Sequence, residues 1–165
     1  MTSISSKRFA ASGKAAALVL AGMLFLGSGS SAMAQSEGNS LEGTWRVQVT
    51  VLDCQTGAVL RTFPALFAFA KGGTVTNTTA GQSPAIFTPG FGVWRHTQGR
   101  TYTAVSEAFV FDPTGVWIQT HRLTRSIELE GDADEFTDSI NLEIFDTSGN
   151  LITTGCGTSV ATRFK

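Results

Sequence analysis

The fold is indicated most directly by residues 43–53, which read GTWRVQVTVLD. Polar and apolar side chains alternate along this stretch, and a period of two residues indicates a β-strand with one buried face. Trp45 and the valines at positions 47, 49 and 51 form that face. Similar segments recur between turns rich in Gly, Asp, Asn and Pro, and no segment has the period of a helix. The sequence therefore predicts an all-β protein.

Eight such strands are predicted. Their approximate bounds are 43–53, 60–70, 73–79, 90–97, 101–112, 116–130, 135–146 and 151–164. Tight turns join most of them, and residues 80–89 form the one longer connection. A series of hairpins leaves no unpaired edge when its first strand pairs with its last. We therefore expect an antiparallel, up-and-down, eight-stranded β-barrel.

The first 34 residues have the pattern of a signal peptide. Lys7, Arg8 and Lys14 give a positive start, and residues 15–26 form a short apolar run. Ala32-Met33-Ala34 supplies the small residues of a cleavage site. We expect export to the periplasm or the extracellular space, with residues 1–34 removed.

Residues 35–165 are expected to form a single barrel domain with one core. The leader holds three basic residues and no acidic one, so the 12 basic and 13 acidic residues of the chain become 9 and 13. This mildly acidic balance predicts no nucleic-acid partner. No apolar run reaches the roughly 20 residues of a transmembrane helix, so no membrane insertion of the mature chain is expected. The oligomeric state stays open.

The chain has two cysteines, Cys54 and Cys156. An oxidising compartment favours a disulfide between them, and the alternative is a pair of buried thiols. The sequence has no C-x-x-C spacing and no cluster of metal ligands, so neither a metal nor a cofactor is predicted.

A hypothetical register can be tested across the seam between the first and last strands. If Cys54 lies directly opposite Cys156, both cysteines point outward and Trp45 lies diagonally beside Arg163 inside the barrel. We expect this tryptophan and arginine to form a structural cation–π lid at one end, with ligand contact as the alternative. A tight turn at Ser148-Gly149 places Gly155 and Gly157 on the inward face of the last strand.

Gly43-Thr44-Trp45 on the first strand, together with Arg163 on the last, resembles the G-x-W motif of lipocalins and other calycins. In that family the tryptophan packs under an arginine from the last strand. Avidins also begin with a G-T-W strand. The resemblance implies a calycin-like barrel. No biotin-site pattern and no histidine near the C-terminus of the haem-binding type is present, so the resemblance implies a fold and not a function.

The turn Asp112-Pro113-Thr114-Gly115 predicts a tight hairpin with a glycine bulge. Its register sets Phe111 opposite Trp117, Phe109 opposite Gln119, and Glu107 opposite His121. We expect this face to point inward because of its aromatic content. A carboxylate and an imidazole would then meet inside the barrel.

Two further sets of residues are predicted to face the lumen. Leu129 opposite Phe136 sets Arg125 diagonal to Asp138, as a ligand anchor or as an internal polar network that fixes register. The turn at Gln98-Gly99 brings Trp94 and His96 inward.

The first functional hypothesis is a binding or carrier barrel for a small apolar ligand, because an eight-stranded barrel can hold one small molecule. The predicted ligand-binding residues are Trp94, His96, Glu107, Phe109, Phe111, Trp117, Gln119, His121 and Arg125.

Two alternatives remain open. One is an isomerase or cyclase, in which Glu107 or His121 transfers a proton, as in barrels that resemble allene oxide cyclase. The other is a structural or interaction barrel filled by side chains, with residues 80–89 acting as a gate or a docking loop.

Overall fold

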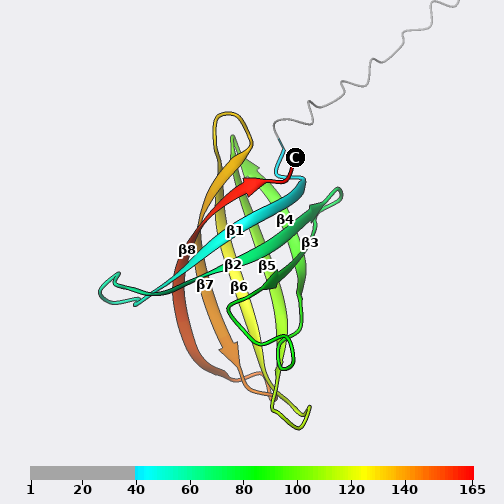
Figure 1. Ribbon diagram of the computed structural model, residues 1–165, viewed down its shortest axis with the longest axis vertical. Helices are drawn as coiled ribbons and strands as arrows, with labels where there is room; N and C mark the ends of the chain where they lie inside the picture. Colours follow the sequence, from blue (N-terminus) through cyan, green and yellow to red (C-terminus); the bar gives the residue numbers. More distant parts are fainter. Residues whose placement is uncertain (1–39) are drawn as a thin grey trace, which may run out of the picture. The chain divides into compact units, whose positions relative to one another are not determined.

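In the computed structural model, which describes residues 40–165, the first strand pairs with the last and closes an eight-stranded antiparallel barrel (Figure 1). The strands are β1 (Gly43–Leu52), β2 (Val59–Ala70), β3 (Thr74–Thr79), β4 (Gly90–Gln98), β5 (Thr101–Phe111), β6 (Trp117–Leu129), β7 (Glu135–Phe145) and β8 (Leu151–Arg163). The predicted bounds agree with these to within one residue at each end. The fold class predicted from the sequence is confirmed.

The predicted signal peptide, residues 1–34, and its cleavage site lie outside the described residues. Within residues 40–165, no helix is long and apolar enough to cross a membrane.

The alternating pattern of β1 works as expected. Trp45, Val47 and Val49 are buried, whereas Arg46 and Gln48 between them are exposed. Because successive side chains of a strand point to opposite faces, every strand contributes one inward set to the barrel interior.

Large side chains fill the barrel at the end where β1 begins. Among the six largest fully buried residues are Trp45, Phe69 and Phe136. The rings of Trp45 and Phe136 lie 4.8 Å apart between centroids, and those of Phe69 and Phe136 lie 6.2 Å apart. Each fully buried large apolar side chain stabilises the fold by about 1.5–3 kcal/mol relative to exposure. This end is a packed core.

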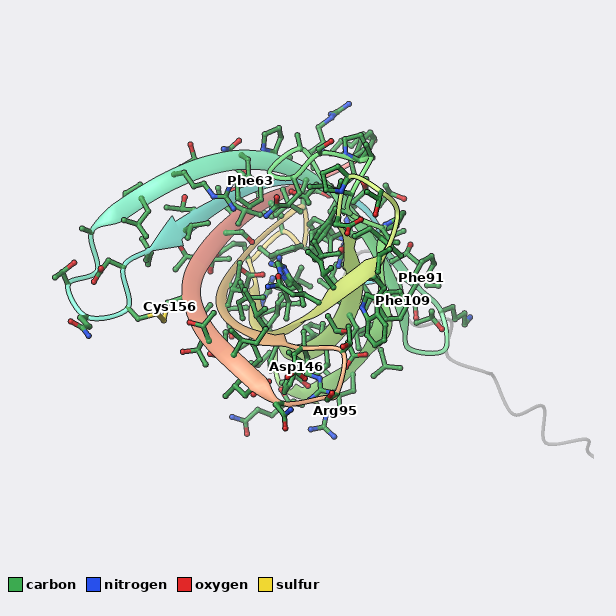
Figure 2. The ribbon with its side chains drawn as sticks, turned by 90° about the horizontal axis from the view of Figure 1, so that it is seen from below. Phe63, Phe91, Arg95, Phe109, Asp146 and Cys156 are labelled. Atoms are coloured by element: carbon green, nitrogen blue, oxygen red, sulfur yellow. A yellow bond between two sulfur atoms is a disulfide. The ribbon has the colours of Figure 1, made fainter. Side chains whose placement is uncertain are left out.

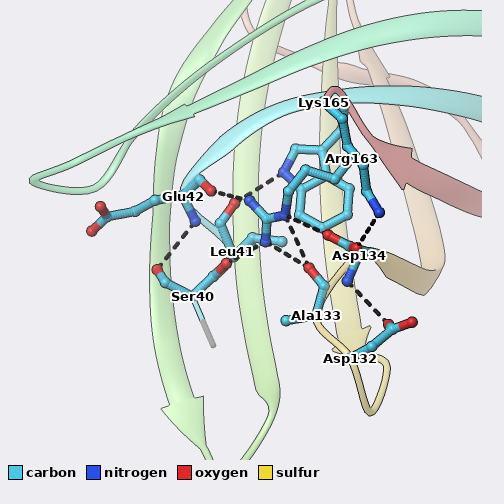
Figure 3. Close-up of polar contacts among 9 residues, drawn as sticks. Ser40, Leu41, Glu42, Asp132, Ala133, Asp134, Arg163 and Lys165 are labelled. Atoms are coloured by element: carbon cyan, nitrogen blue, oxygen red, sulfur yellow. Dashed lines mark hydrogen bonds and ion pairs between the residues drawn. The ribbon is translucent and has the colours of Figure 1, made fainter. Parts of the chain in front are cut away.

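Arg163 covers that core (Figure 3). Its guanidinium carbon lies 4.2 Å from the centroid of the Trp45 ring. The guanidinium donates to the backbone carbonyls of Glu42, Ser40 and Ala133, at 2.7 Å for Ser40 and at 2.7 and 3.0 Å for Ala133. The predicted cation–π lid is present, and it also joins three separate backbone segments.

Gly43 is required by this lid. Its φ is +125°, a region that side chains rarely adopt, and a Cβ there would lie 2.7 Å from Nη1 of Arg163. The glycine of the G-x-W motif thus leaves room for the arginine.

The register predicted for the β1–β8 seam is wrong by two residues. Trp45 lies directly opposite Arg163, and Cys156 lies opposite Leu52. The reason is the turn after β1, where the Asp53 carboxylate accepts hydrogen bonds from the backbone N–H groups of Gln55 and Thr56. This Asx turn ends β1 at Leu52 and takes Cys54 out of the ladder.

The predicted disulfide between Cys54 and Cys156 is nevertheless present, with a Cα–Cα distance of 5.3 Å. The two cysteines are 102 residues apart in sequence. A cross-link that closes a loop of this length removes roughly 4–5 kcal/mol of chain entropy from the unfolded state. The disulfide therefore ties the β1–β2 hairpin to β8.

We expect Arg163→Lys to lower the free energy of unfolding by about 2–4 kcal/mol, because a lysine cannot donate to three carbonyls at once. Urea denaturation would measure this loss. Arg46→Lys is the matched control, since exposed Arg46 also stacks on a ring, that of Phe164 at 4.1 Å. Equal losses in the two variants would show that the carbonyl contacts contribute nothing.

Candidate ligand cavity

The barrel is hollow at the end opposite the Trp45 core, where it encloses a cavity of about 140 Å³. Figure 2 views the barrel from this side. The cavity wall is mainly apolar. Its lining residues are Val49, Val51, Arg61, Phe63, Phe67, Asn77, Thr79, Gln82, Phe87, Ala108, His121, Leu123, Arg125, Ile140, Leu142, Gly155, Cys156 and Gly157.

Small inward residues explain why this end is hollow. Gly155 lies opposite Leu142, and Gly157 lies opposite Ile140, as predicted from the β7–β8 turn. A Cβ at Gly155 would be in van der Waals contact with the Leu142 side chain at 3.4 Å. Ala108 occupies the inward position of β5 in the cavity wall. The inward positions of β8 and of β5 in the cavity wall therefore hold only glycine or alanine.

A buried ion pair forms the floor of the cavity. Arg125 donates from Nη1 to Oδ2 of Asp138, and these side chains are 4% and 0% exposed. Ser159 donates to the other carboxylate oxygen at 2.6 Å and lies 3.4 Å from Nη1. The diagonal placement of Arg125 and Asp138 predicted from the sequence is confirmed, since Ile127 pairs with Asp138 and Arg125 with Ile140.

This ion pair is not fully satisfied within the barrel. Nε of Arg125 is buried and has no hydrogen-bond partner among the described residues. The guanidinium carbon lies 4.5 Å from the centroid of the Phe67 ring. A buried donor without an acceptor costs roughly 1–3 kcal/mol.

The mouth of the cavity is covered by residues 80–89. Phe87 forms an isolated bridge with Val110, and the backbone N–H of Phe111 donates to the Ile86 carbonyl at 2.8 Å. These bonds hold the segment against the end of β5. The Phe87 ring then packs against the imidazole of His121, with 5.4 Å between centroids. The structure thus places the long loop at the barrel mouth, as the gate hypothesis expected.

His121 is the titratable side chain at this mouth. It is 9% exposed, and its Nε2 lies 3.4 Å from Oε1 of Gln119. Burial lowers the pKa of His121 from its ordinary value of 6.5. The imidazole is therefore neutral at pH 7, and it can offer either a donor or an acceptor nitrogen to the lumen.

The predicted pairing of Glu107 with His121 is wrong. Phe111 pairs with Trp117 as expected, but the register shifts at the next residue, so Ala108 faces His121 and Glu107 faces Arg122. The cause is a β-bulge that leaves Ile118 unpaired. The extra residue shifts the β6 residues that follow it by one position, so their side chains point to the face opposite to the predicted one.

Glu107 lies outside the barrel because the other face of β5 points inward, and it forms an ion pair with Arg122 at 2.7 Å. Phe109 and Phe111 share its outward face by alternation along β5. Phe109 is 48% exposed and packs against Trp117 at 5.7 Å between ring centroids. Figure 2 shows Phe91 and Phe109 on the outer side of the strands. The expectation that aromatic content marks the inward face is therefore wrong for this hairpin.

Trp94 and His96 lie at the packed end and not in the cavity. Trp94 points inward as predicted, donates to the Ala70 carbonyl at 3.0 Å and packs against Phe69 and Tyr102. His96 lies on the same face as Trp94 and packs against Tyr102 at 5.0 Å between ring centroids, but it is exposed at the rim and does not line the cavity. Its Nε2 lies 2.8 Å from the Gly99 carbonyl in the following turn.

Of the predicted ligand-binding residues, His121 and Arg125 line the cavity, and Gln119 contacts His121. The sequence analysis did not select Phe63, Phe67 and Asn77, which also line it. A signal was present, because phenylalanine or alanine occupies every second position from Phe63 to Phe69. That alternation marks the inward face of β2.

A larger depression of about 510 Å³ lies at the β6–β7 turn, beside β8, and includes Glu130, Asp132 and Glu135. Its carboxylates do not converge, because residues 40–165 contain no group of three potential metal ligands. We therefore assign no site to it.

No protein-family model matches the chain, and a search of curated proteins found no significant match. The closed eight-stranded antiparallel topology is consistent with a calycin-like fold. Function must therefore be argued from the cavity itself.

The lowered pKa of His121 predicts a pH dependence of stability. Burial makes His121 harder to protonate in the folded chain than in the unfolded chain. The stability that depends on its neutral form is therefore fully present above about pH 6.5 and is lost as the pH falls through the folded pKa. Between pH 7 and pH 5, wild type should lose more free energy of unfolding than His121→Gln. Urea denaturation across this range measures the difference. Equal losses in wild type and His121→Gln would place the effect elsewhere.

Proposed function

We propose that the barrel binds one small, mainly apolar molecule in its hollow end. The observation that carries the proposal is the cavity of about 140 Å³ in the barrel, with mainly apolar walls, an ion-paired floor and Phe87 at its mouth. An apolar cavity of about 150 Å³ in another protein takes up benzene. The expected ligand is therefore about the size of one substituted ring.

Apolar burial supplies the driving force for such binding. Removal of apolar surface from water contributes about 25 cal/mol per Å², and the lining side chains from Val49 to Leu142 are already held by the barrel. Little ordering is then needed when a ligand enters, because the wall is formed by strands of one closed sheet.

The enzymatic alternative loses its main support. It required a carboxylate beside His121, but Glu107 lies outside the barrel and Asp138 is bonded to Arg125 and Ser159. A neutral histidine without a carboxylate partner is a weaker case for proton transfer than for ligand contact. The structural alternative expects an interior filled by side chains, and this holds only for the end of the barrel at Trp45.

We also propose that the protein is exported. The disulfide between Cys54 and Cys156 supports this, because disulfides persist in oxidising compartments. The pattern of residues 1–34 supports it independently.

When the full chain is expressed in a bacterium with a periplasm, the envelope fraction should contain a protein that begins at Gln35. Its intact mass should be lower than that of the reduced protein by two hydrogen atoms. Mass spectrometry measures both properties. Ala32→Leu with Ala34→Leu should block the cleavage. An uncleaved, fully reduced wild-type protein in the cytosol would contradict the proposal.

Gly155→Leu tests the binding proposal, because the new side chain would project into the cavity. We expect binding of benzene or toluene to weaken by at least about tenfold, as filled volume excludes the ligand. The three tryptophans do not line the cavity, so methyl NMR signals of Leu123, Ile140 and Leu142 are the suitable readout.

Thr154→Leu is the matched control, because Thr154 is the exposed neighbour on the same strand. It adds the same side chain outside the barrel and should leave binding unchanged. Equal affinity of Gly155→Leu and wild type would rule out this cavity as the binding site.

A further inference from the structure

The floor of the cavity is formed by Arg125, which has one hydrogen-bond donor without a partner among the described residues and whose positive charge is balanced by Asp138. Both hydrogen bonds that the described residues give the Arg125 guanidinium come from Nη1, and its Nε is buried without an acceptor. Arg125 borders the cavity. Asn77, another polar residue of the lining, donates from Nδ2 to Ser106 at 3.1 Å. Arg125 is thus a lining residue with a buried donor that has no acceptor among the described residues.

The charges at the floor of the cavity cancel. The positive charge of Arg125 is matched by Asp138, whose carboxylate is completely buried. His121 is neutral at pH 7 because burial lowers its pKa. An anionic ligand head at this floor would therefore add an uncompensated charge in a region of low dielectric, which is strongly unfavourable. An uncharged acceptor carries no such penalty.

The rim of the cavity offers one further cation. Arg61 lines the mouth, is exposed, and donates to the Gly81 carbonyl at 3.1 Å. An ion pair formed there with a ligand would be accessible to water and would contribute little. The buried donor at the floor therefore decides the ligand chemistry.

We infer that the cavity selects an uncharged ligand with a compact apolar body and one hydrogen-bond acceptor, such as the carbonyl oxygen of a ketone, aldehyde or ester. The carbonyl accepts from Arg125 at the floor. The apolar body extends along Leu123 and Leu142 towards Phe87 at the mouth. This inference rests on the proposed function, since it names the ligand class of the same site.

Three probes of nearly equal size test it: acetophenone, α-methylstyrene and benzoate. They share a ring and differ in a carbonyl, a methylene and a carboxylate. In a cavity without a donor the hydrocarbon binds best, because a carbonyl loses its hydrogen bonds to water. Wild type should instead bind acetophenone about tenfold more tightly than α-methylstyrene, and benzoate least. Calorimetric titration gives the three affinities.

A direct readout is the ¹H–¹⁵N signal of the Arg125 side chain. It should shift on addition of acetophenone and stay in place with α-methylstyrene. The double variant Arg125→Met with Asp138→Leu removes both charges together, a type of replacement that buried ion pairs often tolerate. It should reverse the preference in favour of the hydrocarbon. If this variant does not fold, the probe series and the NMR signal of wild type still decide.

The outcomes separate the inference from the function on which it rests. Binding of both neutral probes with a hydrocarbon preference and an unchanged Arg125 signal would overturn the inference and leave the binding function intact. Tightest binding of benzoate would also overturn it and would point to Arg61. Failure of all three probes to bind would overturn the proposed function, and the inference with it.

Discussion

The contact of Arg163 with Trp45 is the constraint on which the rest of the barrel depends. It joins the last strand to the first and fixes their register, with Trp45 directly opposite Arg163. The same guanidinium binds backbone carbonyls before β1 and in the β6–β7 turn. Closure of the sheet between β1 and β8 and one sealed end of the barrel follow from this arrangement.

Closure at one end divides the barrel into two halves with different contents. The half next to Trp45 holds large rings such as Phe69 and Phe136, and it supplies apolar stabilisation. The other half has glycines and alanines at inward positions and retains a cavity. Between them lies the Arg125–Asp138 ion pair. A buried pair of this kind is costly to form, and the removal of one partner alone would leave an unpaired charge inside the barrel.

The fold could be predicted almost completely, whereas the site could be predicted only in part. Strand bounds follow from local alternation and turn residues, and both act over a few positions. Membership of a cavity depends on face and register: the aromatic face of β5 points outward with Glu107, and one bulge at Ile118 places Ala108 instead of Glu107 opposite His121. The β6–β7 hairpin has no such bulge, so the prediction for Arg125 and Asp138 is confirmed.

By itself, the sequence determined the all-β class, the eight strands, the disulfide partners and the Trp45–Arg163 lid, because each depends on residue type and local spacing. Only the tertiary structure decided which side chains share the lumen. The spacing of residues alone does not predict how the Asx turn at Asp53 or the bulge at Ile118 changes the register of the strands beside it. Each moves whole strands relative to their neighbours, and the position of a strand is set by the entire closed sheet.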